Sequence, residues 1–414
     1  MLLPDTAVFH AALCAAFRTG RVAVGIGSRS GIREISHLIA RSEASVLVTT
    51  RTLRGVDTAE LVASLRAEHP GLDVVFADER ADVSFERVSA NGELTSLPVE
   101  LKQFPATSPC FVTSAVSMLN STSGTTGLPK LVTQTEDRWV GFSEIAAEAA
   151  AIGSDEVFLG AVPAPFGFGL WTSHFLPALL GARNVVMERF DVSVMIELIE
   201  RERVTALNCV STQFKMLLRS EAAESADLSS LRFMFTGGEA VPYSEALAFE
   251  QRTGAAVLQF YGSNETGAVS VTTVSDGSDT RLKTCGHVID RMQVRVFDDA
   301  AKEMTGSVRR GQPGVNGPLM CQGYWGTPMR TTSCTPTTVG CFSATSSRST
   351  RQDGCVWSGA KPTSSFVAAR TSPRSKSRST CARTLRWSWS PWSGSTIRCS
   401  VRRSVRSSCP PMTI

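Results

Sequence analysis

The stretch "STSGTTGLPK", residues 121–130, decides how the chain is interpreted. Gly124 and Gly127 allow the backbone to turn its N–H groups toward an anion, and Lys130 adds a point charge that phosphates favour. Hydroxyl donors surround the glycines at Ser121, Thr122, Ser123, Thr125 and Thr126. The strict nucleotide loop G-x-x-x-x-G-K-[ST] is absent, so the stretch predicts either a different phosphate-binding loop or a solvated linker.

Patterns typical of strands and helices alternate along the chain around this stretch. Residues 44–50, "ASVLVTT", are typical of a short buried strand, whereas residues 6–20 and 191–204 have helical periodicity. The apolar face of the first helix is predicted to hold Val8, Ala11, Ala12, Ala15 and Ala16; that of the second, Val192, Met195, Ile196 and Ile199. This alternation predicts an α/β fold with mostly parallel sheets covered by helices.

Two predicted strands end in glycine turns, "LRFMFTGGEAV" at 231–241 and "AVLQFYGSNETG" at 256–267. Ligands of parallel sheets bind at the carboxyl ends of the strands, where both turns are expected. Glu265 offers an oxygen ligand for Mg²⁺, and Tyr261 could stack on a base. The alternatives are a core position for Tyr261 and a solvated turn for Glu265.

Five segments in order, "STSGTTGLPK", "TGGEAV", "FYGSNETG", "GHVIDRMQVRVFDD" and "GPLMCQGYWGTP", resemble the adenylate-forming (AMP-binding) superfamily of acyl-CoA synthetases and carboxylic acid–CoA ligases. The resemblance covers residues 1–328. It implies the large N-terminal domain of these enzymes, with mostly parallel sheets flanked by helices and a small β subdomain. The start of the chain resembles a point inside that domain, so an N-terminal segment is expected to be missing.

The resemblance also implies roles for individual residues. Lys130 and Glu265 would be catalytic, and Glu265 with Thr126 would bind Mg²⁺. Phe166 and Gly262 would border the acyl pocket. The ATP site would comprise Thr122, Ser123, Gly124, Thr125, Thr126, Gly127, Lys130, Gly237, Gly238, Glu239, Gln259, Tyr261, Gly262 and Asn264.

The implied reaction is attack of an apolar carboxylate on the α-phosphate of ATP, followed by transfer of the acyl group to coenzyme A. Positioning and charge neutralisation by Lys130 and Mg²⁺ would drive the first step. Two positions depart from the usual pattern: Asn264 replaces a common Thr, and Glu136 replaces a common His. Which acid is used, and the oligomeric state, are not indicated by the sequence.

Charge divides the chain into two parts. Residues 331–414 carry 11 Arg, 2 Lys and one acid, a charge of +12, which leaves −8 for the rest of the net +4. The tail also holds 20 Ser, 13 Thr and 6 Cys without a C-x-x-C pair, so neither a zinc site nor a redox motif is indicated. We therefore predict that residues 329–414 form a disordered tail translated out of frame.

A reading frame displaced by one base supports this prediction. With suitable codons, residues 358–373 permit G-R-K-A-D-I-I-V-R-G-G-E-N-I-S-P, which resembles the hinge of acyl-CoA synthetases. Residues 337–346 permit the D-G-W and G-D-L of the ribose-binding turn. We infer a frameshift between about Gly326 and Thr337, so the C-terminal small domain is not encoded in frame and activity is expected to be impaired.

Two alternatives stay open. The chain could be an active truncated adenylate former with a partner-binding arm, or its basic tail, with Trp387, Trp389 and Trp392, could bind nucleic acid. Nucleic acid is nevertheless not the expected partner, because the basic tail is interpreted as out-of-frame sequence. No apolar run approaches a membrane span and the start is a poor signal peptide, so a cytoplasmic location is expected.

Overall fold

A computed structural model describes residues 1–78, 84–89, 93–97, 114–121, 128–298, 302–304, 312–326, 341–342, 386–390 and 396–402. Among these residues the largest sheet has nine strands, in the order β16-β15-β14-β13-β12-β10-β11-β21-β20. Its centre, from β11 to β14, is parallel, and the flanking pairs are antiparallel. The strands are β10 Val157–Gly160, β11 Arg183–Val185, β12 Ala206–Asn208, β13 Phe233–Gly237, β14 Ala256–Ser263, β15 Gly267–Val271, β16 His287–Val288, β20 Arg386–Ser390 and β21 Thr396–Arg402.

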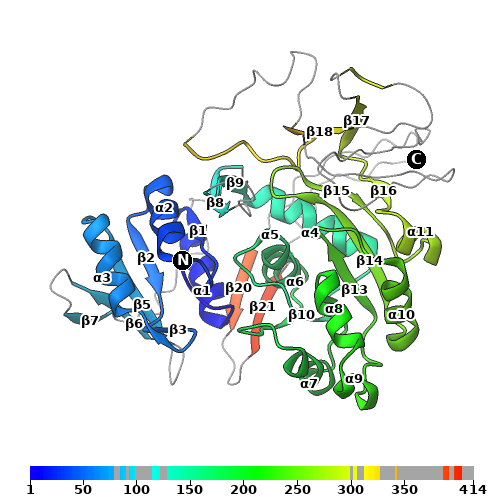
Figure 1. Cartoon of the computed structure of the whole chain (residues 1–414), viewed down its shortest axis with the longest axis horizontal. Helices are drawn as coiled ribbons and strands as arrows, with labels where there is room; N and C mark the ends of the chain where they lie inside the picture. Colours follow the sequence, from blue (N-terminus) through cyan, green and yellow to red (C-terminus); the bar gives the residue numbers. More distant parts are fainter. Residues whose placement is uncertain are drawn as a thin grey trace, which may run out of the picture.

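Helices cover both faces of this sheet, as Figure 1 shows. Alternate residues of each strand face opposite sides, so Met234 packs in one core and its neighbours Phe233 and Phe235 in the other. The Met234 core is closed by α7 Val192–Glu202, α8 Ser211–Leu218 and α10 Tyr243–Thr253, with α9 Glu221–Ser225 and α11 Ser278–Lys283 nearby. The opposite core is closed by α1 Ala7–Arg18, α4 Glu136–Ala150 and the π-helix η1 Trp171–Phe175, which lies between α5 Gly167–Leu170 and α6 Leu176–Leu180.

Smaller sheets complete the described part. Strand β1 pairs in parallel with β8, which pairs antiparallel with β9, and a separate sheet has the order β2-β5-β6-β7 beneath two helices. A third sheet, β17-β18-β19, is antiparallel. The bounds are β1 Ala23–Gly25, β2 Val46–Thr49, β3 Thr52–Leu53, β4 Val56–Asp57, β5 Asp73–Asp78, β6 Ser84–Val88, β7 Leu94–Leu97, β8 Val116–Ser121, β9 Leu131–Thr135, β17 Gln293–Phe297, β18 Gln312–Asn316, β19 Cys341–Phe342, α2 Ile32–Ser42 and α3 Ala59–Glu68.

The predicted α/β fold class is confirmed: helices flank a large sheet whose central strands are parallel, and a small antiparallel sheet accompanies it. The expected parallel pairing holds for the centre of the large sheet, whereas its flanking pairs are antiparallel. The strands at 44–50, 231–241 and 256–267 lie where the sequence predicts them. Helix α7 buries Met195, Ile196 and Ile199 as predicted. It begins after Asp191, whose carboxylate accepts hydrogen bonds from two first-turn N–H groups.

The predicted apolar face of the first helix was right in part, because Val8 is buried and Ala12 and Ala16 pack against the core. Helix α1 does end just before Gly20, but it buries Val8, Phe9, Leu13 and Phe17, while Ala15 is exposed. The larger apolar side chains remove more surface from water than alanines do, so they turn the helix toward the core.

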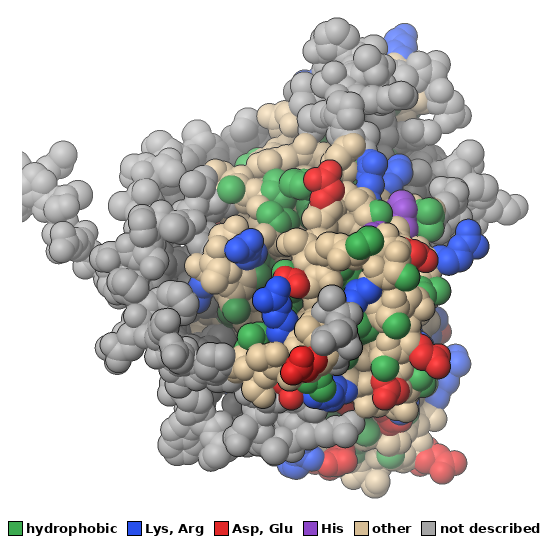
Figure 2. Space-filling model, turned by 90° about the vertical axis from the view of Figure 1, so that its left-hand side faces the viewer, with side chains coloured by type: hydrophobic (Ala, Val, Ile, Leu, Met, Phe, Trp, Pro, Cys, Tyr) green, Lys and Arg blue, Asp and Glu red, His purple; other side chains and the backbone are tan. Residues whose placement is uncertain are grey.

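Three strands fall within residues 329–414, for which a disordered tail was predicted. Strand β21 extends the large sheet beyond β11, β20 pairs with β21, and β19 pairs with β18. The domain boundary at 328 and the frameshift stay predictions. On the face shown in Figure 2, acidic and basic side chains are interspersed. In the part of the chain described here, no helix combines the length and apolar character needed to cross a bilayer.

Candidate active site

The predicted phosphate loop connects β8 to β9 at one edge of the β1-β8-β9 sheet. Its central residues lie outside the described residues: Thr122, Ser123, Gly124, Thr125, Thr126 and Gly127. The two ends of the loop are described. Ser121 is the last residue of β8 and Lys130 directly precedes β9, and the two strands pair there, Ser121 opposite Leu131. The carbonyl of Pro129 also lies 3.1 Å from the ring nitrogen Nε2 of His37 on α2.

Lys130 and Glu265, the two residues predicted to be catalytic, both contact one side chain, that of Tyr324. The Lys130 ammonium lies 4.9 Å from the centre of the Tyr324 ring, within the range of a cation–π contact. The Tyr324 hydroxyl donates a hydrogen bond of 2.9 Å to Glu265 Oε1. Tyr324 belongs to the quoted segment "GPLMCQGYWGTP", but no role was predicted for it.

Backbone hydrogen bonds hold Tyr324 in this position. The Thr133 N–H and hydroxyl both donate to the Gly323 carbonyl, at 3.0 and 2.9 Å, and Trp325 N–H donates to Leu131 at 2.8 Å. On the other side, Cys321 N–H donates to the Glu265 carbonyl at 2.8 Å. Residues 321–325, which we call the clamp segment, therefore join strand β9 to the glycine turn that carries Glu265.

A buried arginine on α4 also supports the glycine turn that carries Glu265. Arg138 on α4 is 2% exposed and donates to the carbonyls of Leu319, Asn264 and Glu265 at 2.7, 3.0 and 3.4 Å. It also donates to the Gln134 side chain, whose amide donates to the Asn264 carbonyl. Burial lowers the pKa of Arg138 to about 10, and the nearby Cys321 and Glu265 oppose this shift. The sequence patterns gave no role to Arg138.

Phe166 lies beside the same turn. It ends the loop that precedes α5, and its ring covers the backbone of Gly27, where a Cβ would lie 3.1 Å from Phe166 Cζ. The next residue, Gly167, has no space for a Cβ because the Asn264 side chain occupies it. The structure therefore places Phe166, which was predicted to border the acyl pocket, next to the glycine turn that carries Asn264 and Glu265. Phe166 is 45% exposed, so the ring is accessible.

The "TGGEA" turn follows the neighbouring strand β13. Gly237 pairs with Phe260 of β14 and lies so close to its carbonyl that a Cβ would collide with it. Gly238 has a φ of +82°, which favours glycine. The carboxylate of Glu239 accepts a hydrogen bond of 3.1 Å from Ser211 N–H at the start of α8.

Gln259 and Tyr261 differ in their surroundings, although both are on β14. The Gln259 amide is buried and donates to the Arg281 carbonyl at the end of α11, at 2.6 Å, so it faces the helices. Tyr261 is partly buried and packs against the core beside Val288. Gly262, after a β-bulge, is exposed at the edge.

The donor set at this edge fits a magnesium nucleotide. Glu265 is half-buried, and its Oε1 is oriented by Tyr324, which leaves the carboxylate suited to bind a hard cation together with phosphate oxygens. Lys130 is exposed beside it, at the exit of the loop. At the other end of β9, burial and Asp137 raise the pKa of Glu136, the residue that replaces a common histidine.

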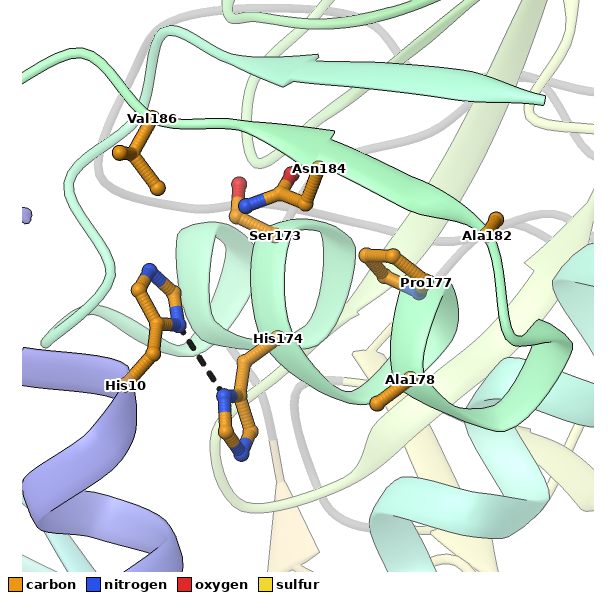
Figure 3. Close-up of a pocket in the computed structure, with 8 residues that line it drawn as sticks. All are labelled: His10, Ser173, His174, Pro177, Ala178, Ala182, Asn184 and Val186. Atoms are coloured by element: carbon orange, nitrogen blue, oxygen red, sulfur yellow. Dashed lines mark hydrogen bonds between the residues drawn. The ribbon is translucent and has the colours of Figure 1, made fainter. Parts of the chain in front are cut away.

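A second polar cluster lies apart from this edge, around a cavity of about 30 Å³ lined by α1, η1, α6 and the segment at β11 (Figure 3). His10 and His174 lie 3.0 Å apart through their Nδ1 atoms, and His10 Nε2 lies 3.1 Å from Asp5. Burial, reinforced by His10, lowers the pKa of His174 well below its usual value. The cavity has room for a water molecule but contains none of the predicted site residues.

Comparison with known proteins agrees with the fold, which is that of the large domain of adenylate-forming enzymes. The chain belongs to the AMP-binding enzyme family, whose model matches residues 1–325. It is 26% identical over 333 residues to a medium-chain fatty-acid–CoA ligase of Escherichia coli K12, covering 79% of this chain and 56% of the relative. It is 30% identical over 331 residues to a feruloyl-CoA synthase of an Amycolatopsis species, covering 79% and 61%.

Solved structures share the fold. An anthranilate CoA ligase in complex with anthranoyl-AMP has a TM-score of 0.71 at 18% identity, over 89% of this chain and 67% of that one. The N-terminal domain of FACL13 from Mycobacterium tuberculosis has a TM-score of 0.69 at 19% identity, over 89% and 84%. The chain spans somewhat more than half the length of the curated relatives it matches.

Proposed function

We propose that this chain binds ATP with Mg²⁺ and an apolar carboxylic acid, and that its chemistry is the formation of acyl-AMP with release of pyrophosphate. In the complete family reaction coenzyme A would then take the acyl group. The observation that supports this best is the meeting of Lys130, Tyr324 and Glu265 at the end of the phosphate loop. A bound Mg²⁺ would supply positive charge at the phosphates.

The residues of the chain would share the work at this edge. Lys130 would donate to the phosphate oxygens, and Glu265 would hold the cation. The backbone of Gly237 and Gly238 would line the adenine and acyl sites, as the family resemblance implies. The donors of residues 122–127 would complete the phosphate cradle.

An apolar acid is supported by the aromatic cluster behind the edge. Trp171 is buried and its ring centre lies 4.6 Å from that of Phe260, 5.9 Å from that of Phe235 and 5.5 Å from that of Phe168. Trp171, Phe235 and Phe260 belong to one buried core, with Phe168 packed against it. A fatty, aromatic or alicyclic acid would lose its hydration shell against such a wall.

We propose further that the chain as translated is impaired in catalysis. The family resemblance implies a ribose-binding Asp, a hinge and a lysine-bearing small domain after residue 328. The ribose-binding turn and the hinge are readable only in the displaced frame, and that frame ends before the lysine motif is expected. The consequence would be weak nucleotide binding and slow acyl transfer to coenzyme A. A cytoplasmic location belongs to the same proposal.

Calorimetric titration with ATP and Mg²⁺, together with acid-dependent ATP–pyrophosphate exchange, tests the proposal. Lys130→Ala should weaken nucleotide binding by about tenfold or more, because a charge-assisted hydrogen bond is lost. Lys283→Ala is the matched control, because Lys283 also lies over a tyrosine ring but on α11. A gene with the frames rejoined between codons 326 and 337 should strengthen nucleotide binding, because it restores the ribose-binding turn. Equal binding by both lysine variants would contradict the assignment, and normal CoA ligation by the unaltered chain would contradict the impairment.

A further inference from the structure

We propose that Tyr324 is a positioning residue that sets the geometry of Lys130 and Glu265 through two different parts of one side chain. The inference rests on the proposed function, because it concerns the same magnesium–nucleotide site. The ring face holds the Lys130 ammonium at 4.9 Å, and the hydroxyl holds Glu265 at 2.9 Å. The two predicted catalytic groups are 135 positions apart in the sequence (265 minus 130), and this side chain connects them.

The hydroxyl acts on the metal ligand. A phenol that donates to Oε1 uses one lone pair of that oxygen and fixes the plane of the Glu265 carboxylate. With the carboxylate plane fixed, the lone pairs of Oε2 keep one orientation. This favours binding of Mg²⁺, which requires near-ideal octahedral geometry. Without this hydrogen bond the carboxylate rotates freely, so Mg²⁺ binding should weaken while ATP binding without metal should change little.

The ring acts on the lysine. Lys130 has an exposed, flexible side chain, and ordering it at a phosphate costs conformational entropy. Contact with the π face leaves the ammonium's N–H donors available on the side away from the ring. Loss of the ring should therefore weaken ATP binding even in the absence of metal.

The clamp segment makes this arrangement rigid. Gly323 and Trp325, on either side of Tyr324, bond to the backbone of β9, and Tyr324 itself forms a bridge with Val132. Cys321 bonds to the residue whose carboxylate Tyr324 orients. A substitution of the side chain leaves all these backbone bonds in place, so its effect on the two catalytic groups can be measured apart from folding.

Two variants separate the two effects. Tyr324→Phe keeps the ring and removes the hydroxyl, and should raise the Mg²⁺ concentration needed for half-maximal nucleotide binding by about tenfold, with metal-free ATP affinity unchanged. Tyr324→Leu removes both, and should in addition lower metal-free ATP affinity by about threefold. The probes are ATP with EDTA and ATP with titrated Mg²⁺. The controls are Tyr243→Phe and Tyr243→Leu, because the Tyr243 ring on α10 makes a similar contact with Lys283 on α11. Neither control should change the affinity for metal-free ATP or the Mg²⁺ dependence.

Unchanged Mg²⁺ dependence in Tyr324→Phe, or equal effects of both Tyr324 variants, would overturn the inference. If the unaltered chain binds no magnesium nucleotide, the proposed function fails, and the positioning role is then judged without ligand. After reductive ¹³C-methylation, the Lys130 signal, assigned with Lys130→Arg, should show a ring-current shift that persists in Tyr324→Phe and disappears in Tyr324→Leu. Persistence of the shift in Tyr324→Leu would refute the role of the ring.

Discussion

Replacing Arg138 gives the sharpest test of how the site is supported. The side chain is 2% exposed, and it donates to the carbonyls of Leu319 and Asn264 at 2.7 and 3.0 Å and to the Gln134 side chain. We expect Arg138→Met to destabilise the protein less than the apparently conservative Arg138→Lys.

Two terms of similar size decide this order. Three hydrogen bonds from a charged donor contribute roughly 5 kcal/mol in all. Against them, burial lowers the pKa of Arg138 to about 10, so burial of the charge costs about 3 kcal/mol. Methionine loses the hydrogen bonds but avoids the burial cost, for a net loss of about 2 kcal/mol. Lysine keeps one hydrogen bond, buries a more strongly hydrated cation, and should lose about 4 kcal/mol.

Urea unfolding at pH 7, followed by tryptophan fluorescence, measures both variants under one condition. The Arg138→Met midpoint should lie between those of the unaltered protein and Arg138→Lys. If Arg138→Lys is the more stable of the two, hydrogen bonding rather than charge burial dominates at this position, and the reasoning is refuted. Both variants should also weaken magnesium-nucleotide binding, because the turn that carries Glu265 loses its support.

Two further predictions follow from a buried group and a close backbone approach. Because burial lowers the pKa of His174, the free energy of unfolding should fall as the pH drops below 6.5. His174→Gln should therefore reduce the fall of Tm at acid pH, and an unchanged fall would show that His174 does not cause it. Gly237→Ala should lower the free energy of unfolding in urea by roughly 2–3 kcal/mol, because a Cβ there meets the Phe260 carbonyl. Gly238→Ala should lower it by about 1 kcal/mol, because Gly238 has space for a Cβ but a φ of +82°; the reverse order would show that the strand can shift.

The sequence predicted the parts of the fold that depend on local patterns. Glycine turns after apolar strands placed Gly237 and Glu265 correctly at one edge, because parallel strands end together. Alternating strand and helix patterns gave the architecture for the same reason. Periodicity was only partly right in α1, where alanines and larger apolar residues share the helix and packing against the sheet selects the buried face.

The support of the site could not be predicted, because it depends on contacts between distant segments. Arg138 appears as an ordinary helix cation in the sequence, and its burial is decided by three carbonyls from residues 264, 265 and 319. Tyr324 lies in a motif that indicates the family but says nothing about which way its ring faces. Gln259 was expected near adenine, and only the course of α11 places a carbonyl within reach of its amide.

The clamp segment also has a consequence for the order of events during synthesis. Thr133 and its partner Gly323 are 190 positions apart, so at roughly 5–20 residues per second the ribosome needs about 10–40 s between making the two. Throughout that interval the backbone of β9 cannot bond to the clamp segment, and Lys130 cannot contact the Tyr324 ring. The nucleotide site of a nascent chain is therefore among the last features to form, and a chaperone that shields β9 would act at this stage.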